Sequence, residues 1–496
     1  MQKHQLFCLS AIALSSLVLL SCSPTSSDSS TSEESQDNGV IRGKILSDNG
    51  NVVIAGIIVE DGNGKTFRTT TNALGAYNIP LAPGQYKITF TRGNEFSTIQ
   101  KNITVEAMKK YYLQDVRLQQ LSDSFSKGWV AGDLHQHTYY SDGSDSVESL
   151  ALSDISQGLY YGFLSDHNVA RGVPEWYNTK NLPVFEDSSG NQRFFNPFEA
   201  VEETTEFGHY QSIGQALTFD KYDMELYDSE RYASDVKDIT KKRIAYIAQT
   251  IRRAGALAQI NHPYQVSTMG FNYWDLVDDF DTLEIWNGKF VPGDGRYEPL
   301  ATISSGSVNY RAKLKWFELL NNGKYLPATG GTDMHDTTSP GQANGIAISD
   351  IKTIDDYGVY CQNVGEYSGV PTTYLNLGND MTKESILAAI KNGHSFISNG
   401  PVTICTVNGK SYGEKIDIAN GSEVTLNNDI FSRDGIEKIR IIKNGQKIKD
   451  IDLNVNSDTS FSNDITLEAV NEGDWIVVET FGRGNQYSIT NPFFFD

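Results

Sequence analysis

The sequence predicts an α/β protein with a β-rich region on either side of its central part. Between residues 126 and 401, short apolar runs alternate with helical patterns, whereas residues 39–119 and 402–496 contain short strand-like runs separated by turn signals. Most of the eight histidines directly follow apolar runs in the central region. Roughly 455 residues beyond the N-terminal segment are too many for one core, so we expect several domains.

Residues 1–22 predict a secretory signal. Lys3 supplies the positive start, and the apolar run from Leu6 to Leu20 is too short for a comfortable membrane span. Its end, Leu19-Leu20-Ser21-Cys22, resembles a bacterial lipobox with a lipidated cysteine; an ordinary signal peptide with an incidental cysteine is the alternative. Residues 23–38, rich in Ser, Thr, Asp and Glu, predict a disordered tether. We therefore expect a cell-envelope protein attached to the membrane through a lipid on Cys22.

Charge and cysteine content exclude several classes of protein. The formal net charge of −21 repels polyanions, so a nucleic-acid polymer is not expected as a partner. Only Cys361 and Cys405 lie beyond the N-terminal segment, which indicates neither a disulfide framework nor a thiolate metal site.

Residues 39–119 predict a β-sandwich of short strands with Asn-Gly, Asp-Gly and Pro-Gly turns. The stretch from Gly75 to Tyr86 resembles carboxypeptidase regulatory-like domains, which have a transthyretin-like sandwich. No chemistry is evident here, so a passive spacer or a carbohydrate-contacting module is expected. Residues 402–496 predict a second small sandwich packed on the central region.

The central region predicts a parallel sheet or barrel, because strands alternate with helices. Residues 230–254 have the apolar spacing of an amphipathic helix, with Gly255 as its C-cap. Thr382 begins a second helix, which ends at Gly393. Polar residues at the C-terminal ends of barrel strands are typical of catalytic sites.

Gly132 to Gly143 holds the clearest sign of chemistry. His135 and His137 lie two residues apart on a predicted strand, so their imidazoles face the same way and could bind one metal ion. Asp142 adds a carboxylate in the following turn. Two histidines on a strand are a weak signal alone, but similar polar motifs follow other apolar runs. These motifs are Ser165-Asp166-His167, Gly208-His209, Asn261-His262 and Asp333-Met334-His335.

These motifs together resemble the PHP (polymerase and histidinol phosphatase) superfamily of metal-dependent hydrolases. Four segments resemble its CehA/McbA-like branch: Gly208-His209, Glu284 to Gly288, Ser398 to Pro401 and Thr490 to Pro492. The resemblance implies a distorted (β/α)7 barrel over residues 126–401 that holds two or three divalent metal ions, Zn, Mn or Fe.

The resemblance also implies how the ligands divide among three sites. The first site would comprise His135, His137, Glu202 and Asp333; in the second, Glu202 would be joined by His209 and His262; the third would comprise Asp142, His167 and His335. Glu202 is preferred to its neighbour Glu203 because it lies seven residues before the Gly-His histidine. Glu202, Asp333 and His335 are expected to be catalytic.

Several other polar residues could belong either to the site or to the surrounding structure. Glu284 and Asn287 could face the pocket or form hydrogen bonds at the edge of the core. Asp133 and Asp166 could orient imidazoles. Two residues are expected to be less directly involved: Arg171 as a solvated loop residue rather than an anion ligand, and His394 as a structural residue at a helix end.

The expected function is metal-dependent hydrolysis in the cell envelope. A metal-bridging hydroxide would attack a small phosphate ester, because clustered cations suit a polyanionic transition state. Hydrolysis of carboxyl or carbamate esters is the first alternative. The second is a non-enzymatic, glycan-binding surface lipoprotein in which the metals are structural.

Overall fold

The structure is a computed structural model of the chain. It describes residues 37–187, 189–219, 236–265, 269–288, 291–292, 305–338, 368–378, 380–484 and 486–496. The expected signal segment, most of the tether and Cys361 lie outside these ranges, so lipidation of Cys22 stays a prediction. Residues Asp37–Asp496 form one compact unit. In the described ranges, no helix has both the length and the apolar character needed to cross a membrane.

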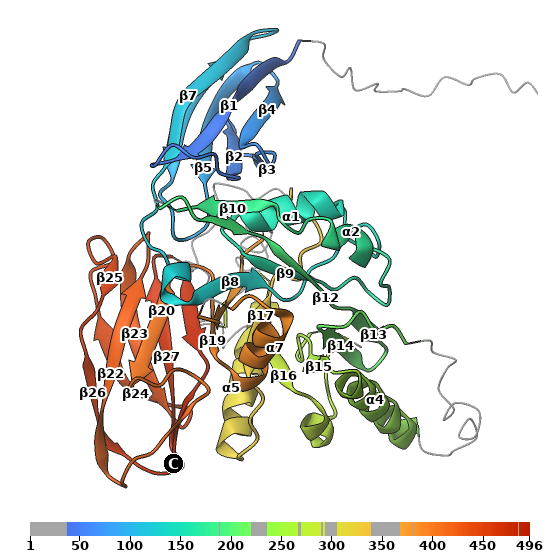
Figure 1. Cartoon of the computed structure of the whole chain (residues 1–496), viewed down its shortest axis with the longest axis vertical. Helices are drawn as coiled ribbons and strands as arrows, with labels where there is room; N and C mark the ends of the chain where they lie inside the picture. Colours follow the sequence, from blue (N-terminus) through green and yellow to red (C-terminus); the bar gives the residue numbers. More distant parts are fainter. Residues whose placement is uncertain are drawn as a thin grey trace, which may run out of the picture. The chain divides into compact units, whose positions relative to one another are not determined.

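The N-terminal part is built from two small sheets (Figure 1). Side chains alternate between buried and exposed along β4, as expected for a strand with one face on a core. Ile41, Ile57, Ile88 and Phe90 belong to one shared core and are fully buried. One sheet has the order β4-β1-β7 (Ala76–Leu81, Gly39–Ser47, Lys110–Leu118), and the other β3-β2-β5-β6 (Thr66–Thr70, Gly56–Asp61, Gly84–Thr91, Ile99–Val105).

The central region contains two groups of paired strands. The first has the order β12-β9-β8-β18-β19 (Asn196–Glu199, Tyr161–Leu164, Trp129–Asp133, Thr372–Asn376, Ser395–Ser398). The second has the order β13-β14-β15-β16-β17 (Glu202–Thr205, Gly208–Ile213, Leu257–Ile260, Thr282–Asn287, Ala328–Gly331). Residues of β8, β9 and β15 are buried along the whole strand, which is typical of sheets covered on both faces.

Helices accompany these strands (Figure 1). They are α1 (Val147–Ser156), α2 (Val173–Tyr177), α4 (Val236–Arg253), α5 (Ser305–Asn321) and α7 (Lys383–Asn392). The predicted helix ends are confirmed for α7, where Thr382 accepts a hydrogen bond from the Ser385 amide and Gly393 adopts φ +68°. Gly255 follows α4 with φ +81°. The first six residues of the predicted helix 230–254 lie outside the described residues.

The two strand groups meet at their polar ends. Isolated parallel bridges join Gln136 to Met334 and His167 to Glu202. The α/β alternation is confirmed. A closed (β/α)7 barrel is not seen in the described residues, where the strands form two separate sheets. Two features depart from the barrel pattern: β13 and β14 form an antiparallel hairpin, and β18 runs antiparallel to β8.

The C-terminal region continues the first central sheet. β19 pairs with β28 (Tyr487–Thr490), and the order runs on through β27 (Trp475–Gly482), β23 (Ile436–Lys443) and β24 (Gln446–Asp452). β21 (Lys415–Ile416) and β29 (Phe493–Phe495) pair at its side. A second sheet comprises β20 (Val402–Val407), β22 (Ser422–Phe431), β25 (Ser460–Phe461) and β26 (Ile465–Val470). The sheet therefore crosses the domain boundary that we predict after residue 401.

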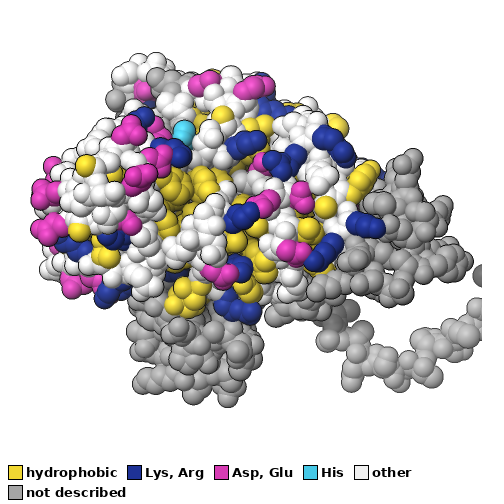
Figure 2. All heavy atoms as spheres, turned by 90° about the horizontal axis from the view of Figure 1, so that it is seen from below, with side chains coloured by type: hydrophobic (Ala, Val, Ile, Leu, Met, Phe, Trp, Pro, Cys, Tyr) yellow, Lys and Arg dark blue, Asp and Glu magenta, His cyan; other side chains and the backbone are white. Residues whose placement is uncertain are grey.

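Four short elements complete the described structure: η1 (Phe125–Lys127), η3 (Trp274–Asp279), β10 (Pro183–Glu186) and β11 (Gln192–Phe194). On the face shown in Figure 2, acidic and basic side chains lie beside one another around exposed apolar side chains. Acidic side chains therefore do not form one continuous negative patch on this face.

Candidate metal centre

The innermost part of the candidate site comprises His135, His137, Glu202 and Asp333. Both histidines follow β8, Glu202 begins β13, and Asp333 follows β17. His135 Nε2 lies 3.1 Å from His137 Nε2, 3.2 Å from Glu202 Oε2 and 3.3 Å from Asp333 Oδ1. His137 Nε2 lies 3.0 Å from Asp333 Oδ1 and 3.4 Å from Glu202 Oε2. The strands therefore bring four ligand-type atoms from three distant segments to one point.

These spacings fit a divalent cation. Four ligand atoms arranged tetrahedrally at ~2.0–2.1 Å from an ion lie about 3.3–3.4 Å from one another. The five distances given above span 3.0–3.4 Å. Imidazole nitrogens with carboxylate oxygens are the donor set that Zn, Mn and Fe accept. The described residues thus satisfy both the spacing and the chemistry of a metal site.

Glu202 turns its two oxygens toward different histidines. Its Oε1 lies 3.1 Å from His209 Nδ1 and 3.1 Å from His262 Nε2. Its Oε2 lies 3.2 Å from His135 Nε2 and 2.9 Å from His167 Nδ1. A carboxylate in this position can serve two neighbouring cations at once.

A third group surrounds Asp142 at the exposed side of the site. Its two oxygens approach His335 Nε2 at 3.2 Å and His167 Nε2 at 3.5 Å. The ring of His137 stacks on those of His167 and His335, with centroid distances of 4.3 and 4.4 Å. His137 therefore borders both the inner and the outer group, whereas the sequence assigned it to the inner group only.

The structure brings all nine predicted ligands together, but in a somewhat different grouping. Ligand atoms of His137, Asp142, His167 and His335 form one set, and those of His135, His137, Glu202 and Asp333 form another. In a third set, His167 joins Glu202 and His209. His167 thus lies between the predicted second and third sites.

Glu202 rather than Glu203 faces the histidines. The two residues are neighbours on β13, so their side chains point to opposite faces. Glu203 is buried away from the cluster, and burial raises the pKa of its carboxyl group to about 7, an effect that Arg243 of α4 opposes. This placement agrees with the choice of Glu202 made from its spacing to His209.

Opposite charges compensate one another inside the site. Burial alone would raise the pKa of the Glu202 and Asp333 carboxyl groups, but His135 and other histidines hold both pKa values well below their usual range. Burial opposes the charged form of His135, yet the surrounding carboxylates raise its pKa well above the ordinary value. Burial lowers the pKa of His137 to about 4. The carboxylates thus favour positive charge at this point, which a bound cation would supply.

Three residues around the ligands were not assigned to the site from the sequence. Asn261 donates to Glu202 Oε1 at 2.8 Å. In the sequence, only its position before His262 pointed to the site. Glu284 and Asn287, for which two interpretations were open, both contact ligand residues. Asn261 directly follows β15, and Glu284 and Asn287 lie within and at the end of β16.

The hydrogen bonds of Asp133 and Asp166 run mainly to the backbone and to hydroxyl groups. Asp133 accepts from the His135 and Thr332 amides, and Asp166 accepts from the Thr138 amide. Arg171 is exposed. His394 follows the last residue of α7 and its cap, and burial lowers its pKa.

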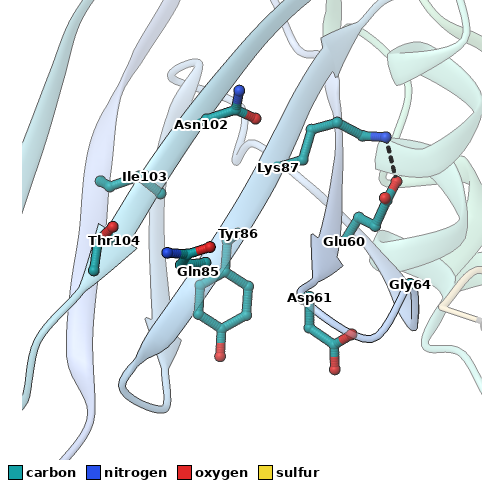
Figure 3. A pocket seen from close by; sticks show the side chains of 10 residues that line it. Glu60, Asp61, Gly64, Gln85, Tyr86, Lys87, Asn102, Ile103 and Thr104 are labelled. Carbon is teal, nitrogen blue, oxygen red and sulfur yellow. Dashed lines mark ion pairs between the residues drawn. The ribbon is translucent and has the colours of Figure 1, made fainter.

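A separate hollow lies on the N-terminal part (Figure 3). It has a volume of about 580 Å³ and includes the ring of Tyr86 and the side chains of Gln85 and Asn102. Lys87 forms an ion pair with Glu60 at its edge, 2.5 Å apart. Its lining contains neither histidine nor cysteine, so it does not resemble the cluster of the central region.

One curated protein is similar to part of this chain in sequence. A segment of 119 residues is 29% identical to DNA polymerase/3′-5′ exonuclease PolX of Bacillus subtilis (strain 168), covering 23% of this chain and 17% of PolX. The chain thus spans under a fifth of that relative.

Two solved structures are similar at low identity. One is a two-domain protein of Bacteroides vulgatus described as containing a predicted PHP-like metal-dependent phosphoesterase: 13% identity, 73% of this chain, 95% of that chain, TM-score 0.34. The other is an amidohydrolase of Chromobacterium violaceum: 14% identity, 41% of this chain, 87% of that chain, TM-score 0.25. Both TM-scores lie below 0.5.

Residues 40–119 match the family described as carboxypeptidase regulatory-like domain. They include the stretch from Gly75 to Tyr86 that suggested this family, and they fold into the two sheets expected of it. Residues 40–119 are therefore a carboxypeptidase regulatory-like domain.

Proposed function

We propose that the chain is a PHP-type metal-dependent hydrolase that cleaves small phosphate esters. The observation that carries this proposal is the inner ligand group, whose five interatomic distances of 3.0–3.4 Å match the edges of a metal coordination tetrahedron. In this proposal, the two central sheets are the parts of a distorted (β/α)7 barrel, with the ligands at their polar ends. Bound cations would supply a nucleophile from water at neutral pH and neutralise charge that develops on a phosphoryl group.

In this proposal, the ligand side chains form three metal sites. His135, His137, Glu202 and Asp333 would hold one cation; His209 and His262 would hold a second with the other oxygen of Glu202; and Asp142, His167 and His335 would hold the third. Glu202 is the shared residue because each of its oxygens faces a different set of histidines.

His335 is prepared to act as a ligand at the open side. Its Nδ1 lies 2.8 Å from the backbone oxygen of Asp333, which can only accept, so Nδ1 carries the hydrogen. The lone pair of Nε2 then points toward Asp142. Because Asp142 and His335 are the most exposed ligands, at 58% and 31%, substrate would enter on their side.

A panel of chromogenic substrates tests this function. The full chain is stripped of metal, reconstituted separately with Zn, Mn and Fe, and assayed on p-nitrophenyl phosphate, bis-p-nitrophenyl phosphate, p-nitrophenyl acetate and a naphthyl carbamate. Metal-dependent turnover of a phosphate ester is the expected result. Turnover of only the acetate or the carbamate would replace phosphoester hydrolysis with ester hydrolysis. Tight metal binding without any turnover would favour a binding protein.

We also propose that a lipid on Cys22 attaches the enzyme to the cell envelope, on the basis of the segment Leu19-Leu20-Ser21-Cys22. A single acyl chain would bind only weakly, so stable attachment needs more than one. Cys22→Ala should move the protein from the membrane fraction to the soluble fraction. If the unchanged protein is itself soluble, the lipobox interpretation is wrong.

A further inference from the structure

Glu284 occupies the centre of a hydrogen-bond network behind the metal ligands. It lies on β16 and is 1% exposed, so its carboxylate depends on protein donors. Its Oε1 lies 3.0 Å from His135 Nδ1. Its Oε2 accepts from the backbone amide of His262 at 2.9 Å and from Asn287 Nδ2 at 3.2 Å.

Asn287 extends this network to a third ligand. Its Nδ2 also donates to Asp333 Oδ2 at 3.2 Å, so one amide group joins the two carboxylates. The position of Asn287 is fixed in turn by Asn309 of α5, whose side chain bonds to both the amide and the carbonyl of Asn287. Residues from β16 therefore connect the ends of β8, β15 and β17.

Two of the connected ligands have backbones that side-chain-bearing residues rarely adopt. His262 has φ +23° and Asp333 has φ +50°. Such conformations are strained and persist only where the surroundings hold them. Glu284 bonds to the amide of His262, and Asn287 bonds to the carboxylate of Asp333, so the network holds both strained residues directly.

We propose that Glu284, together with Asn287, is a positioning residue that aligns His135, His262 and Asp333 for metal binding. The carboxylate accepts the Nδ1 hydrogen of His135 and thereby leaves Nε2 as the nitrogen that faces Glu202 and Asp333. This inference rests on the proposed metal centre. It assigns Glu284 to the metal site instead of to the edge of the core.

The surroundings leave little room for another arrangement. A Cβ atom on Gly331 would lie 2.9 Å from Glu284 Oε1 and 2.3 Å from the Cβ of His135. β17 therefore needs a glycine where it passes between the carboxylate and the histidine. Glu284→Gln is disruptive although it has the same shape. The NH₂ group of a glutamine side chain is a donor. In one orientation it would face the donors of His262 and Asn287, and in the other it would face the Nδ1 hydrogen of His135.

The test compares metal affinity in variants of the full chain. Affinity is measured by competition with a chelator, and the cobalt(II)-substituted proteins are compared by their visible absorption spectra. Asp154→Asn is the matched control: Asp154 is also fully buried close to the site, but it bonds to Gln136, which is not a ligand. Its buried carboxyl has a raised pKa, so an amide resembles its neutral form.

Glu284→Gln should weaken the tightest metal site about 10- to 100-fold and change the cobalt spectrum. Asn287→Ala should weaken it less, because the bond between Glu284 and His135 remains. Asp154→Asn should leave affinity and spectrum unchanged. Melting curves of the metal-free proteins identify any variant that fails to fold. If Glu284→Gln does not fold, the metal affinity of Asn287→Ala tests the positioning role.

Wild-type affinity and spectrum in both Glu284→Gln and Asn287→Ala would overturn the positioning role while leaving the metal centre intact. An equal loss in Asp154→Asn would also overturn it, because any buried polar change would then suffice. A wild-type protein that binds no metal would instead remove the proposed function itself.

Discussion

The inner and outer parts of the ligand cluster are built differently. His135, His137 and Glu202 have fully buried side chains; the two histidines lie in the segment that follows β8, and Glu202 begins β13. Asp142 has a side chain that is 58% exposed and belongs to a loop after β8. The inner ligands are fixed before any cation arrives, whereas the outer group must order an exposed side chain on binding. We therefore expect the inner cation to bind more tightly than the outer one.

The inner and outer groups are also expected to have different roles. The inner group includes the carboxylate that faces two sets of histidines, and it is supported by Glu284, Asn287 and Asn261. The outer group borders solvent and so can contact substrate. Changes to the inner group should affect the whole centre, and changes to the outer group should affect one site.

Glu202→Gln should have the largest effect. The amide keeps the shape of Glu202 but loses the charge that serves both neighbouring sites. Turnover should fall at least ~1,000-fold, about 4 kcal/mol of barrier, with lower metal content. Steady-state kinetics measures the turnover, and elemental analysis measures the metal content. Glu203→Gln is the matched control on the opposite face of β13 and should retain turnover; the reverse pattern would show that Glu203 is the ligand.

Glu479→Gln should reduce stability by roughly 3 kcal/mol. Glu479 of β27 pairs with Lys313 of α5 at 2.7 Å, and both side chains are almost fully buried. The variant replaces the carboxylate of a buried ion pair with a neutral amide, and breaking such a pair is costly in an apolar interior. Since α5 also carries Asn309, we expect weaker inner-site affinity than in wild type. Denaturant unfolding of the metal-free protein provides the measurement, and unchanged stability would contradict the account.

Asp142→Asn should lower turnover only about tenfold, or ~1.4 kcal/mol. Asp142 contacts His335 and His167, which both belong to the outer group. The variant should therefore lose one metal per chain and keep the others. If Asp142→Asn abolishes turnover while Glu202→Gln does not, the division between the inner and outer groups is wrong.

Glu95→Gln should have the smallest effect on turnover, because Glu95 lies outside the metal centre and accepts hydrogen bonds from the amide and hydroxyl of Ser124. Burial raises its pKa from 4.5 to about 7. The folded protein therefore binds more protons than the unfolded chain, so this contribution to stability is complete below pH ~4.5 and disappears as pH rises through 7. Between pH 5 and pH 8, wild type should lose roughly 2–3 kcal/mol of stability relative to Glu95→Gln. Parallel unfolding curves at pH 5 and 8 measure the difference; no difference would place Glu95 in contact with solvent.

The sequence predicted which residues come together in the candidate site better than how they group there. The spacings of His135 with His137 and of Asp333 with His335 are local, although the structure places both pairs after β8 and β17 rather than on these strands. Thr382 and Gly393 likewise mark the ends of α7 through local hydrogen bonds. The double contact of His137 depends instead on ring stacking between segments nearly 200 residues apart.

Long-range pairing explains what sequence analysis missed. The antiparallel hairpin of β13 and β14 and the pairing of β28 with β19 depend on hydrogen bonds between backbones, which leave no pattern in side chains. Glu284 could be placed on a strand, but its contacts with His135 and His262 come from the segments that follow β8 and β15. Those contacts exist only once the strands have assembled.

Metal content is the measurement that tests the central claim most directly. The full chain is reconstituted separately with Zn, Mn and Fe, freed of excess metal and analysed by elemental mass spectrometry during titration with a chelator. The account predicts two to three ions per chain, with one lost well before the others and also missing from Asp142→Asn. Less than one ion per chain with all three metals would contradict it.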